Sequence, residues 1–318
     1  MNIKPLVSVI SLTFNQEKYI KDCIEGILAQ QTDFPIEVLV FDDASTDHTS
    51  DILRLYAKNY PTIIKPTIYS ENNFSRGLGF VGLYEGFEKA QGKYIAICEG
   101  DDFWTDPNKL QRQVNYMESH PDCYFTFHRS STKWEGKGDC PYNYETQKVC
   151  DRDYTSSELL EEWIVPFASV LFRTEITKYP IKNRKAFFSG DDILYYQAAE
   201  YGKIHGMSAE MSVYRIYQKS ISRNDQQMIH RLKVYPEHYI NIYLNFPSID
   251  RKKLRHRIAV QIYHRMNVTS SLWERTKDWF RMARWDFPYA WNYLSDRLKW
   301  YWIYPVKRGI MKKFTWNK

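Results

Sequence analysis

The first hundred residues alternate between two hydrophobic patterns, and this alternation limits the fold more than any other feature. Short apolar runs typical of buried strands lie at 6–12, 37–41, 63–69 and 95–98. Between them, apolar residues recur at helical spacing over 19–28, 52–56 and 80–90. Strands separated by helices predict an α/β fold, in which a mostly parallel central sheet with right-handed crossovers is flanked by helices.

Acidic residues gather where two of the predicted strands end. Asp42 and Asp43 follow the second strand, and the fourth is followed by Glu99, Asp101 and Asp102. Ligands of parallel sheets bind beyond the carboxyl ends of the strands, so we expect both groups to face one crevice. Adjacent carboxylates repel one another unless a cation lies among them, and a hard divalent ion that also holds substrate phosphates fits this pattern. Gly100 would let the backbone approach a ligand closely.

Both acidic groups also have simpler explanations. The later group precedes Asp106-Pro107, a favourable helix start, so its charges could belong to a helix-capping turn. The earlier group precedes residues of capping type, although the pair Asp42-Asp43 exceeds what a cap requires. A carboxylate at a strand end can also accept hydrogen bonds from a uracil imide or a ribose hydroxyl. The chain lacks both Gly-x-Gly-x-x-Gly at the first turn and Gly-x-x-x-x-Gly-Lys-Ser/Thr, which disfavours a dinucleotide site and an ordinary P-loop.

The net charge of +6 conceals a strong asymmetry along the chain. Residues 225–318 hold 19 Lys and Arg against 7 Asp and Glu, a net charge of +12. Residues 1–224 therefore hold 25 against 31, a net charge of −6, and seven of the ten tryptophans follow residue 270. We predict two parts: an α/β domain over 1–224 and a basic, aromatic-rich helical extension over 225–318.

The predicted extension carries helical stripes of apolar and aromatic residues beside basic ones. Such helices suit an anionic membrane interface, although they could instead pack on the α/β domain with the basic face in solvent. No apolar run reaches eighteen residues and the N-terminus lacks an apolar signal-peptide segment, so we expect a cytoplasmic protein, peripheral on the inner face of the cell membrane. Basic and aromatic residues also bind single-stranded nucleic acids, but no nucleic-acid motif accompanies them, so we expect no such partner.

Several short motifs occur in order along residues 5–222. They are Val7–Ile10 with Phe14-Asn15, Asp42–Asp47, Glu71–Asn73 with Arg76, Ala90–Ile95, Glu99–Trp104 and Asp106–Leu110. Their order and spacing make the chain similar to the inverting, nucleotide-sugar-dependent glycosyltransferases of family 2, which have the GT-A fold. The resemblance implies a GT-A-type sheet flanked by helices, followed by the C-terminal helical extension.

The resemblance also implies roles for individual positions. The donor nucleotide would be held by Asp43 with help from Asp42, by Arg76, and by Phe14, Asn15, Glu99 and Gly100. Asp101 fills the metal-binding position of the family's Asp-x-Asp motif, for Mg or Mn, and Asp102 would share the ligation. Glu99 replaces the first Asp of that motif, so its longer side chain is expected at the ribose or at a metal-bound water.

A further acidic pair, Asp191-Asp192, opens a predicted helix, where the helix dipole favours negative charge. A simple N-terminal charge pair would explain it. The family, however, carries its general base at the second position of such a pair, which maps to Asp192, with Asp191 as the fallback. Tyr217 stands where relatives often have a histidine near the diphosphate. That role would then fall to Arg215, Lys219 or the waters of the ion, and Trp104 is a further candidate for contact with acceptor or phosphate.

The resemblance implies the function, and the chemistry of sugar transfer explains why a carboxylate base and a cation are needed. An acceptor hydroxyl must lose its proton as it attacks the anomeric carbon, and a cation stabilises the charge that builds on the departing diphosphate. We expect a metal-dependent, inverting hexosyltransferase that moves a sugar from a nucleotide-diphospho-sugar, in the first place a UDP-sugar, to a glycan or lipid-linked acceptor in surface polysaccharide biosynthesis.

Two alternatives to this function stay open. A sugar-1-phosphate nucleotidyltransferase would need a Gly- and Arg-rich loop after the first strand, where residues 14–17 are Phe-Asn-Gln-Glu. A non-catalytic relative that only binds sugar or a partner enzyme would not need the acidic residues at both 101 and 192.

Overall fold

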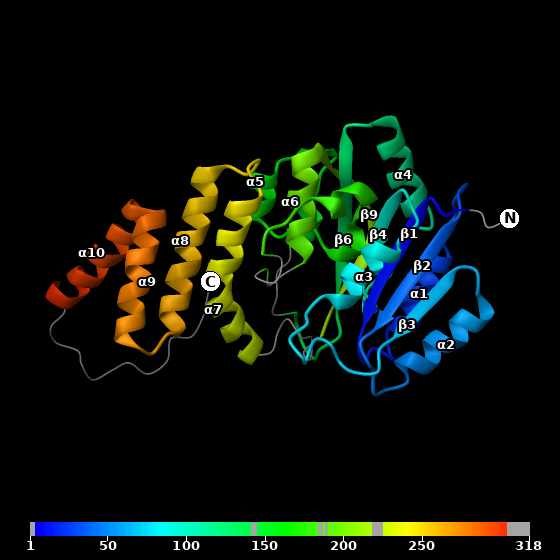
Figure 1. Ribbon diagram of the computed structural model, residues 1–318, viewed down its shortest axis with the longest axis horizontal. Coiled ribbons are helices and arrows are strands. Elements are labelled where there is room, and N and C mark those ends of the chain that lie inside the picture. Colours follow the sequence, from blue (N-terminus) through cyan, green and yellow to red (C-terminus); the bar gives the residue numbers. More distant parts are fainter. Residues whose placement is uncertain (1–3, 141–144, 184–186, 188–189, 218–224, 304–318) are drawn as a thin grey trace.

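The computed structural model describes residues 4–140, 145–183, 187, 190–217 and 225–303, with the backbone alone at 191, 225–228 and 296–303. Within these residues nine strands form one sheet in the order β3-β2-β1-β4-β8-β6-β9-β5, with β7 paired to β9 (Figure 1). The parallel strands predicted from the first hundred residues are β1 (Val7–Thr13), β2 (Ile36–Asp42), β3 (Ile64–Ile68) and β4 (Tyr94–Ile97).

The second half of the sheet is mixed in direction. β8 (Leu171–Arg173) runs antiparallel to β4 and to β6 (Cys123–Trp134), whereas β6 and β9 (Lys203–Ile216) are parallel. Two short strands, β5 (Phe103–Trp104) and β7 (Arg152–Tyr154), pair antiparallel with β9. The predicted α/β architecture is confirmed, with parallel pairing among β1 through β4 and again between β6 and β9.

Helices cover both faces of the sheet, because alternate residues of a strand point to opposite sides. Val9 and Val40 lie in one core, and Ile10 and Phe41 lie in the other. The first core is covered by α1 (Ile20–Leu28), α2 (Thr49–Asn59) and α4 (Lys109–Ser119). The second is covered by α3 (Val81–Lys89), α5 (Ser156–Glu161) and α6 (Asp191–Tyr201).

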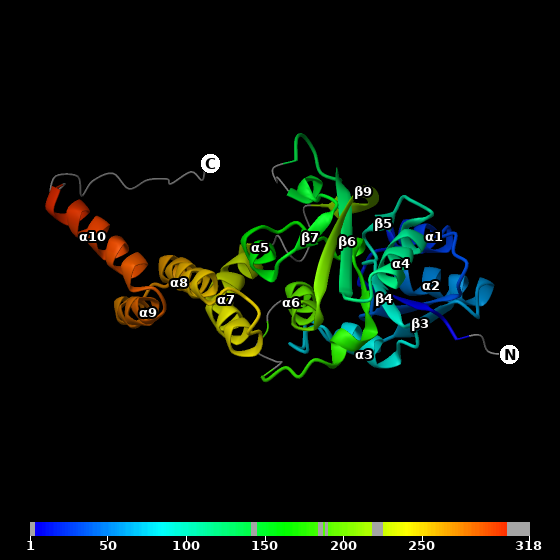
Figure 2. The same ribbon diagram turned by 90° about the horizontal axis from the view of Figure 1, so that it is seen from above.

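The extension forms a row of helices that leads away from the sheet (Figure 2). In chain order these are α7 (Asp225–Asn245), α8 (Arg251–Val268), α9 (Leu272–Trp285) and α10 (Phe287–Ile303). The hydrophobic core crosses the compositional boundary at residue 225. Phe246 is fully buried, and its ring centroid lies 5.5 Å from that of Tyr179 and 5.8 Å from that of Tyr196 in α6. None of the described helices is long and apolar enough to span a bilayer.

Candidate functional site

The loops that follow β1, β2 and β4 are joined to one another at the edge of the sheet. The backbone N–H of Asp43 donates to the Thr13 carbonyl at 3.0 Å, and that of Gly100 donates to the Leu12 carbonyl at 2.9 Å. The end of β1 therefore holds both acidic loops, one on each side, as the topology predicted.

Asn15 ties the first of these loops to the second. Its side-chain oxygen accepts a hydrogen bond from the Thr46 N–H at 2.7 Å, and its own N–H donates to Ser45 Oγ at 2.8 Å. Asn15 has a φ of 52°, a left-handed conformation that asparagine adopts more easily than most residues. This turn leaves Phe14, a half-buried side chain, next to the joined loops.

The neighbouring carboxylates of Asp42 and Asp43 have different surroundings. Asp42 is fully buried and accepts hydrogen bonds from the hydroxyls of Ser45 and Ser50, so it braces its loop from inside. Asp43 is only partly buried, and it accepts hydrogen bonds from the backbone N–H groups of Asn73 and Phe74 at 2.8 and 3.0 Å and from the Asn73 side chain. A carboxylate has about four acceptor positions, so Asp43 can accept one more hydrogen bond from a ligand.

Arg76 lies on the loop that Asp43 holds. Its guanidinium is 2.5 Å from Glu71, and its side chain is 54% exposed. The Arg76 cation therefore lies at the surface of this loop, in an exposed ion pair that contributes little stability.

The acidic loop after β4 presents Asp101. Its Oδ2 accepts a hydrogen bond from the Tyr217 hydroxyl at 3.0 Å, and its carbonyl accepts one from Arg215 at 2.9 Å. Burial and the charge of Asp101 raise the pKa of Tyr217, so the phenol stays protonated and keeps donating. Gly100 is required here by packing, because a Cβ would lie 2.8 Å from Thr13 Oγ1.

Asp102 points into the protein and not toward Asp101's exposed side. It is 1% exposed, its Oδ1 accepts the Arg215 N–H at 2.8 Å, and its Oδ2 has no hydrogen-bond partner among the described residues. Burial, reinforced by the charges of Asp101 and Glu99, raises the pKa of Asp102 well above its usual range. This inward placement does not suit shared metal ligation with Asp101.

Two residues expected at acceptor or phosphate instead brace the loop. The Arg215 side chain is 1% exposed and forms ion pairs with Asp22 at 2.7 Å and Glu135 at 3.3 Å. Trp104 is buried, and its indole N–H donates to the Ala168 carbonyl at 2.8 Å. Burial thus removes both side chains from a substrate. Lys219, the third of this group, lies outside the described residues.

A divalent cation at this edge would need ligands from the substrate as well as from the protein. In the described part of the chain, no group of three or more His, Cys, Asp or Glu side chains is placed to hold a metal ion. Mg²⁺, however, is commonly bound by one or two carboxylates together with substrate phosphates. Asp101 supplies such a carboxylate, and the half-buried Glu99 lies two residues before it.

Asp192 lies at the start of α6, where the second acidic pair was predicted. Its Oδ2 is 2.8 Å from Nε2 of His238, and its Oδ1 is buried with no hydrogen-bond partner in the residues described. The Asp191 backbone begins the helix, but its side chain lies outside what the structure describes. Sequence reasoning missed His238, because a single histidine inside a helical pattern indicates neither a partner nor a function.

The start of α6 adjoins the segment that follows the loop held by Asp43. A Cβ on Gly190 would lie 3.3 Å from the Leu83 side chain and 3.6 Å from that of Phe80, at the start of α3. That Asp192 shares one cleft with Asp43 and Asp101 stays a prediction.

Curated relatives match different lengths of this chain. A Mycobacterium tuberculosis protein of uncharacterised function, Rv1520, is 34% identical over 214 residues, which are 66% of this chain and 58% of that protein. A Bacillus subtilis protein assigned provisionally to teichuronic acid biosynthesis as the glycosyltransferase TuaG is 37% identical, over 40% of this chain and 47% of its own. An uncharacterised glycosyltransferase of Nostoc, alr2836, is 25% identical over 92% of this chain and 88% of its own.

Solved structures share the fold at low sequence identity. Residues 1–349 of S. aureus TarS, in complex with UDP-GlcNAc, superpose with a TM-score of 0.60 at 18% identity, covering 87% of this chain and 79% of that one. The mannosyltransferase PcManGT of Pyrobaculum calidifontis, in complex with GDP-Man and Mn²⁺, gives a TM-score of 0.55 at 16% identity, covering 95% and 82%.

A family model described as Glycosyl transferase family 2 matches residues 8–179, which is more than half of the chain. The match covers the joined loops after β1, β2 and β4 and extends through β8. The resemblance inferred from the sequence motifs is confirmed: this chain belongs to glycosyl transferase family 2.

Proposed function

We propose that this chain is an inverting glycosyltransferase that moves a sugar from a nucleoside diphosphate sugar to a hydroxyl of a glycan or lipid-linked acceptor. The observation that carries the proposal is the joining of two acidic loops by the end of β1, which holds Asp43 and Asp101 on either side of one strand. Family membership supports the reaction class.

The donor class and the pathway rest on the relatives. One structural neighbour is titled with UDP-GlcNAc and another with GDP-Man and Mn²⁺, so a nucleoside diphosphate sugar is common to both. We take UDP-sugars as the first donors to test. The assignment of TuaG to teichuronic acid biosynthesis supports a role for this chain in surface polysaccharide synthesis.

Each candidate residue has a part in the proposed reaction. Asp43 would accept a hydrogen bond from the base or ribose of the donor, and Asp101, steadied by Tyr217, would hold Mg²⁺ or Mn²⁺. When bound, the cation would offset the charge that builds on the departing diphosphate. Asp192, whose side chain is 16% exposed, would take the proton of the acceptor hydroxyl.

The alternatives have less support. A nucleotidyltransferase would need a Gly- and Arg-rich phosphate loop after β1, where this chain has a turn built on Asn15 and held by Ser45 and Thr46. A non-catalytic relative would bind the nucleotide and do nothing further, which the following experiment separates.

The test measures nucleoside diphosphate released from UDP-sugars with Mn²⁺ and lipid-linked acceptors, alongside calorimetric binding of UDP. We expect Asp192→Asn to lower kcat by about 10²–10⁴-fold, the usual contribution of a general base, while UDP binding persists. Asp101→Asn should weaken the metal dependence of UDP binding.

Asp51→Asn is the matched control, because Asp51 is an exposed carboxylate paired only at the surface with Arg54 and His48. Its kcat should equal that of the wild type. UDP binding without turnover on any acceptor would favour the binding-only relative, and no binding of any nucleoside diphosphate would reject the proposal.

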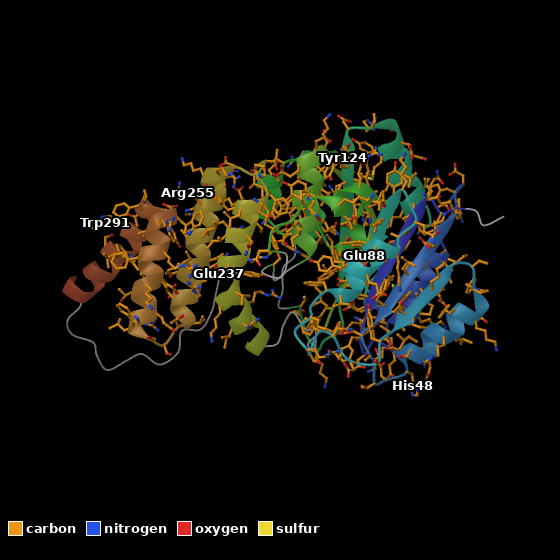
Figure 3. The ribbon with its side chains drawn as sticks, in the orientation of Figure 1. His48, Glu88, Tyr124, Glu237, Arg255 and Trp291 are labelled. Atoms are coloured by element: carbon orange, nitrogen blue, oxygen red, sulfur yellow. The ribbon has the colours of Figure 1, made fainter. Side chains whose placement is uncertain are left out.

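We further propose that the extension holds the enzyme on the inner face of an anionic membrane. Large apolar side chains on α9 and α10 are exposed, among them Trp273 at 67%, Phe280 at 64% and Trp291 at 54%. Figure 3 shows Trp291 near the end of the molecule away from the sheet. Other apolar residues of α9 face inward, since Trp279 and Ala283 pack against the core.

A further inference from the structure

A histidine of the extension contacts the carboxylate proposed as the general base. His238 lies in α7, directly after Glu237, which Figure 3 labels on that helix. Its side chain is 1% exposed, and Nε2 is 2.8 Å from Oδ2 of Asp192 in α6. The contact joins residues 46 positions apart, one on each side of the compositional boundary at 225.

Aromatic rings surround the imidazole on several sides. The centroid of the His238 ring lies 5.7 Å from that of Phe187, 5.8 Å from Tyr235 and 5.2 Å from Tyr239. Packed rings restrict an imidazole to few orientations, because protein interiors are close-packed. The direction in which His238 presents Nε2 is therefore set by the surrounding core.

The two oxygens of Asp192 are treated differently by the protein. Oδ2 meets His238, whereas Oδ1 is buried and has no hydrogen-bond partner among the described residues. A buried carboxylate oxygen without a hydrogen bond lowers the stability of the fold, so the presence of Asp192 at this position needs an explanation. The Asp192 side chain as a whole is 16% exposed, and a general base needs a carboxylate that is both held in place and within reach of the acceptor hydroxyl.

We infer that His238 is a positioning residue for Asp192: its Nε2–H donates to Oδ2 and holds the carboxylate in the orientation in which it takes the proton of the acceptor hydroxyl. The inference rests on the proposed function. In that step the acceptor O–H bond breaks, its oxygen bonds to the anomeric carbon, the bond from that carbon to the diphosphate breaks, and the proton goes to Asp192. His238 keeps its own proton throughout.

Neighbouring phenols do not compete for this proton. Burial, followed by the negative charge of Asp192, raises the pKa of Tyr196 and of Tyr239 above the ordinary phenol value. Both hydroxyls therefore remain protonated at neutral pH. Of these three groups, Asp192 is therefore the one that we assign as the acceptor of the proton.

Two substitutions in the full-length chain separate positioning from packing. His238→Gln keeps an N–H donor but loses the ring, whereas His238→Phe keeps a ring and loses the donor. If His238 positions Asp192, His238→Phe should lower kcat by about ten- to a hundredfold, as misplacement of a catalytic group does, with the KM for the UDP-sugar nearly unchanged. His238→Gln should recover most of that loss.

A purely structural role predicts the opposite order, with His238→Phe more active than His238→Gln. That order, or equal activity of the two variants, would overturn the inference. The stoichiometry of UDP binding measures the amount of folded protein in each preparation. A variant that folds poorly is therefore not mistaken for one with a low kcat.

His256→Ala is the matched control, since it breaks another histidine–aspartate pair of the extension, 2.7 Å to Asp286, where the imidazole is half-exposed. It should leave kcat unchanged. If Asp192→Asn retains wild-type transfer, the proposed base is rejected and the inference with it. If Asp192→Asn is inactive but His238→Phe keeps wild-type kcat, the inference alone fails.

Discussion

Lys109 places an amino group in the dry interior below the site. It is fully buried, its Nζ lies 2.7 Å from Gln113 Oε1, and the centroid of the Trp104 ring is 4.2 Å away. Burial lowers the pKa of Lys109 from 10.5 to about 7. Between these two values the unfolded chain binds a proton that the folded chain lacks. The free energy of unfolding therefore rises as the pH increases from about 7 toward 10.

We predict that Lys109→Met removes this rise. The difference in unfolding free energy between wild type and variant should change by up to about 1.4 kcal/mol per pH unit in that window. Urea unfolding at several pH values measures it. Lys148→Met, at an exposed lysine, should follow the wild type. An identical pH dependence in Lys109→Met and the wild type would show that the buried amino group keeps its ordinary proton affinity.

The candidate site was predictable where a short pattern sets the position of a side chain. Asp43 and Asp101 lie at strand ends, as alternation of strands and helices requires. Trp104 and Arg215 carry side chains of types that often contact substrates, but both are buried. Their burial depends on contacts with Ala168 and Asp22, which are far away in the sequence. No local pattern carries that information, and the same holds for the contact between His238 and Asp192.

At the scale of elements, Gly92 controls how closely β1 and β4 can approach. A Cβ there would lie 2.6 Å from the Ser8 nitrogen and 2.7 Å from the Tyr94 carbonyl oxygen, both of which are backbone atoms. Backbone in a paired sheet cannot move aside, so we predict that Gly92→Ala lowers the unfolding free energy by about 1–3 kcal/mol or more.

Gly190→Ala provides the comparison for this prediction. Its Cβ would first meet the flexible Leu83 side chain at 3.3 Å, so the loss of stability should be clearly smaller. Urea unfolding of both variants checks the order. Equal losses would mean that the strand pair opens more easily than its contacts suggest.

Strands of predominantly apolar composition were easier to predict than β9. The strands β1, β2 and β4 are mostly apolar, because both of their faces are covered by helices. β9 mixes charged and apolar residues and pairs in parallel with β6, roughly eighty positions away. The polar end of β6, Arg129–Lys133, is strand because β9 pairs with it, and its own composition does not indicate this.

At the scale of the whole molecule, we have proposed that the extension contacts a membrane. The exposed Trp273 and Trp291 would enter a bilayer interface, and each nearby Lys or Arg would contribute about 1 kcal/mol at an anionic surface. We predict that the protein co-sediments with vesicles containing phosphatidylglycerol, less so at high salt, and weakly with phosphatidylcholine alone.

Replacing both Trp273 and Trp291 by alanine should weaken vesicle binding about tenfold, or ~1.4 kcal/mol. Trp163→Ala is the control, because Trp163 is exposed to 41% but belongs to the α/β part. Failure of the wild type to bind phosphatidylglycerol vesicles even at low salt would leave the extension as a packing element alone.

The sharp change in composition at 225 predicted a separate helical extension, and in the structure Phe246 of that part packs with Tyr179 and Tyr196 of the α/β part. A chimera that takes its last ninety residues from a homologous enzyme would thus arrive with foreign side chains beneath α6. Replacing the extension to change the proposed membrane contact would therefore also disturb the packing of α6, which carries Asp192. The proposed membrane contact and the proposed catalytic helix cannot be exchanged separately.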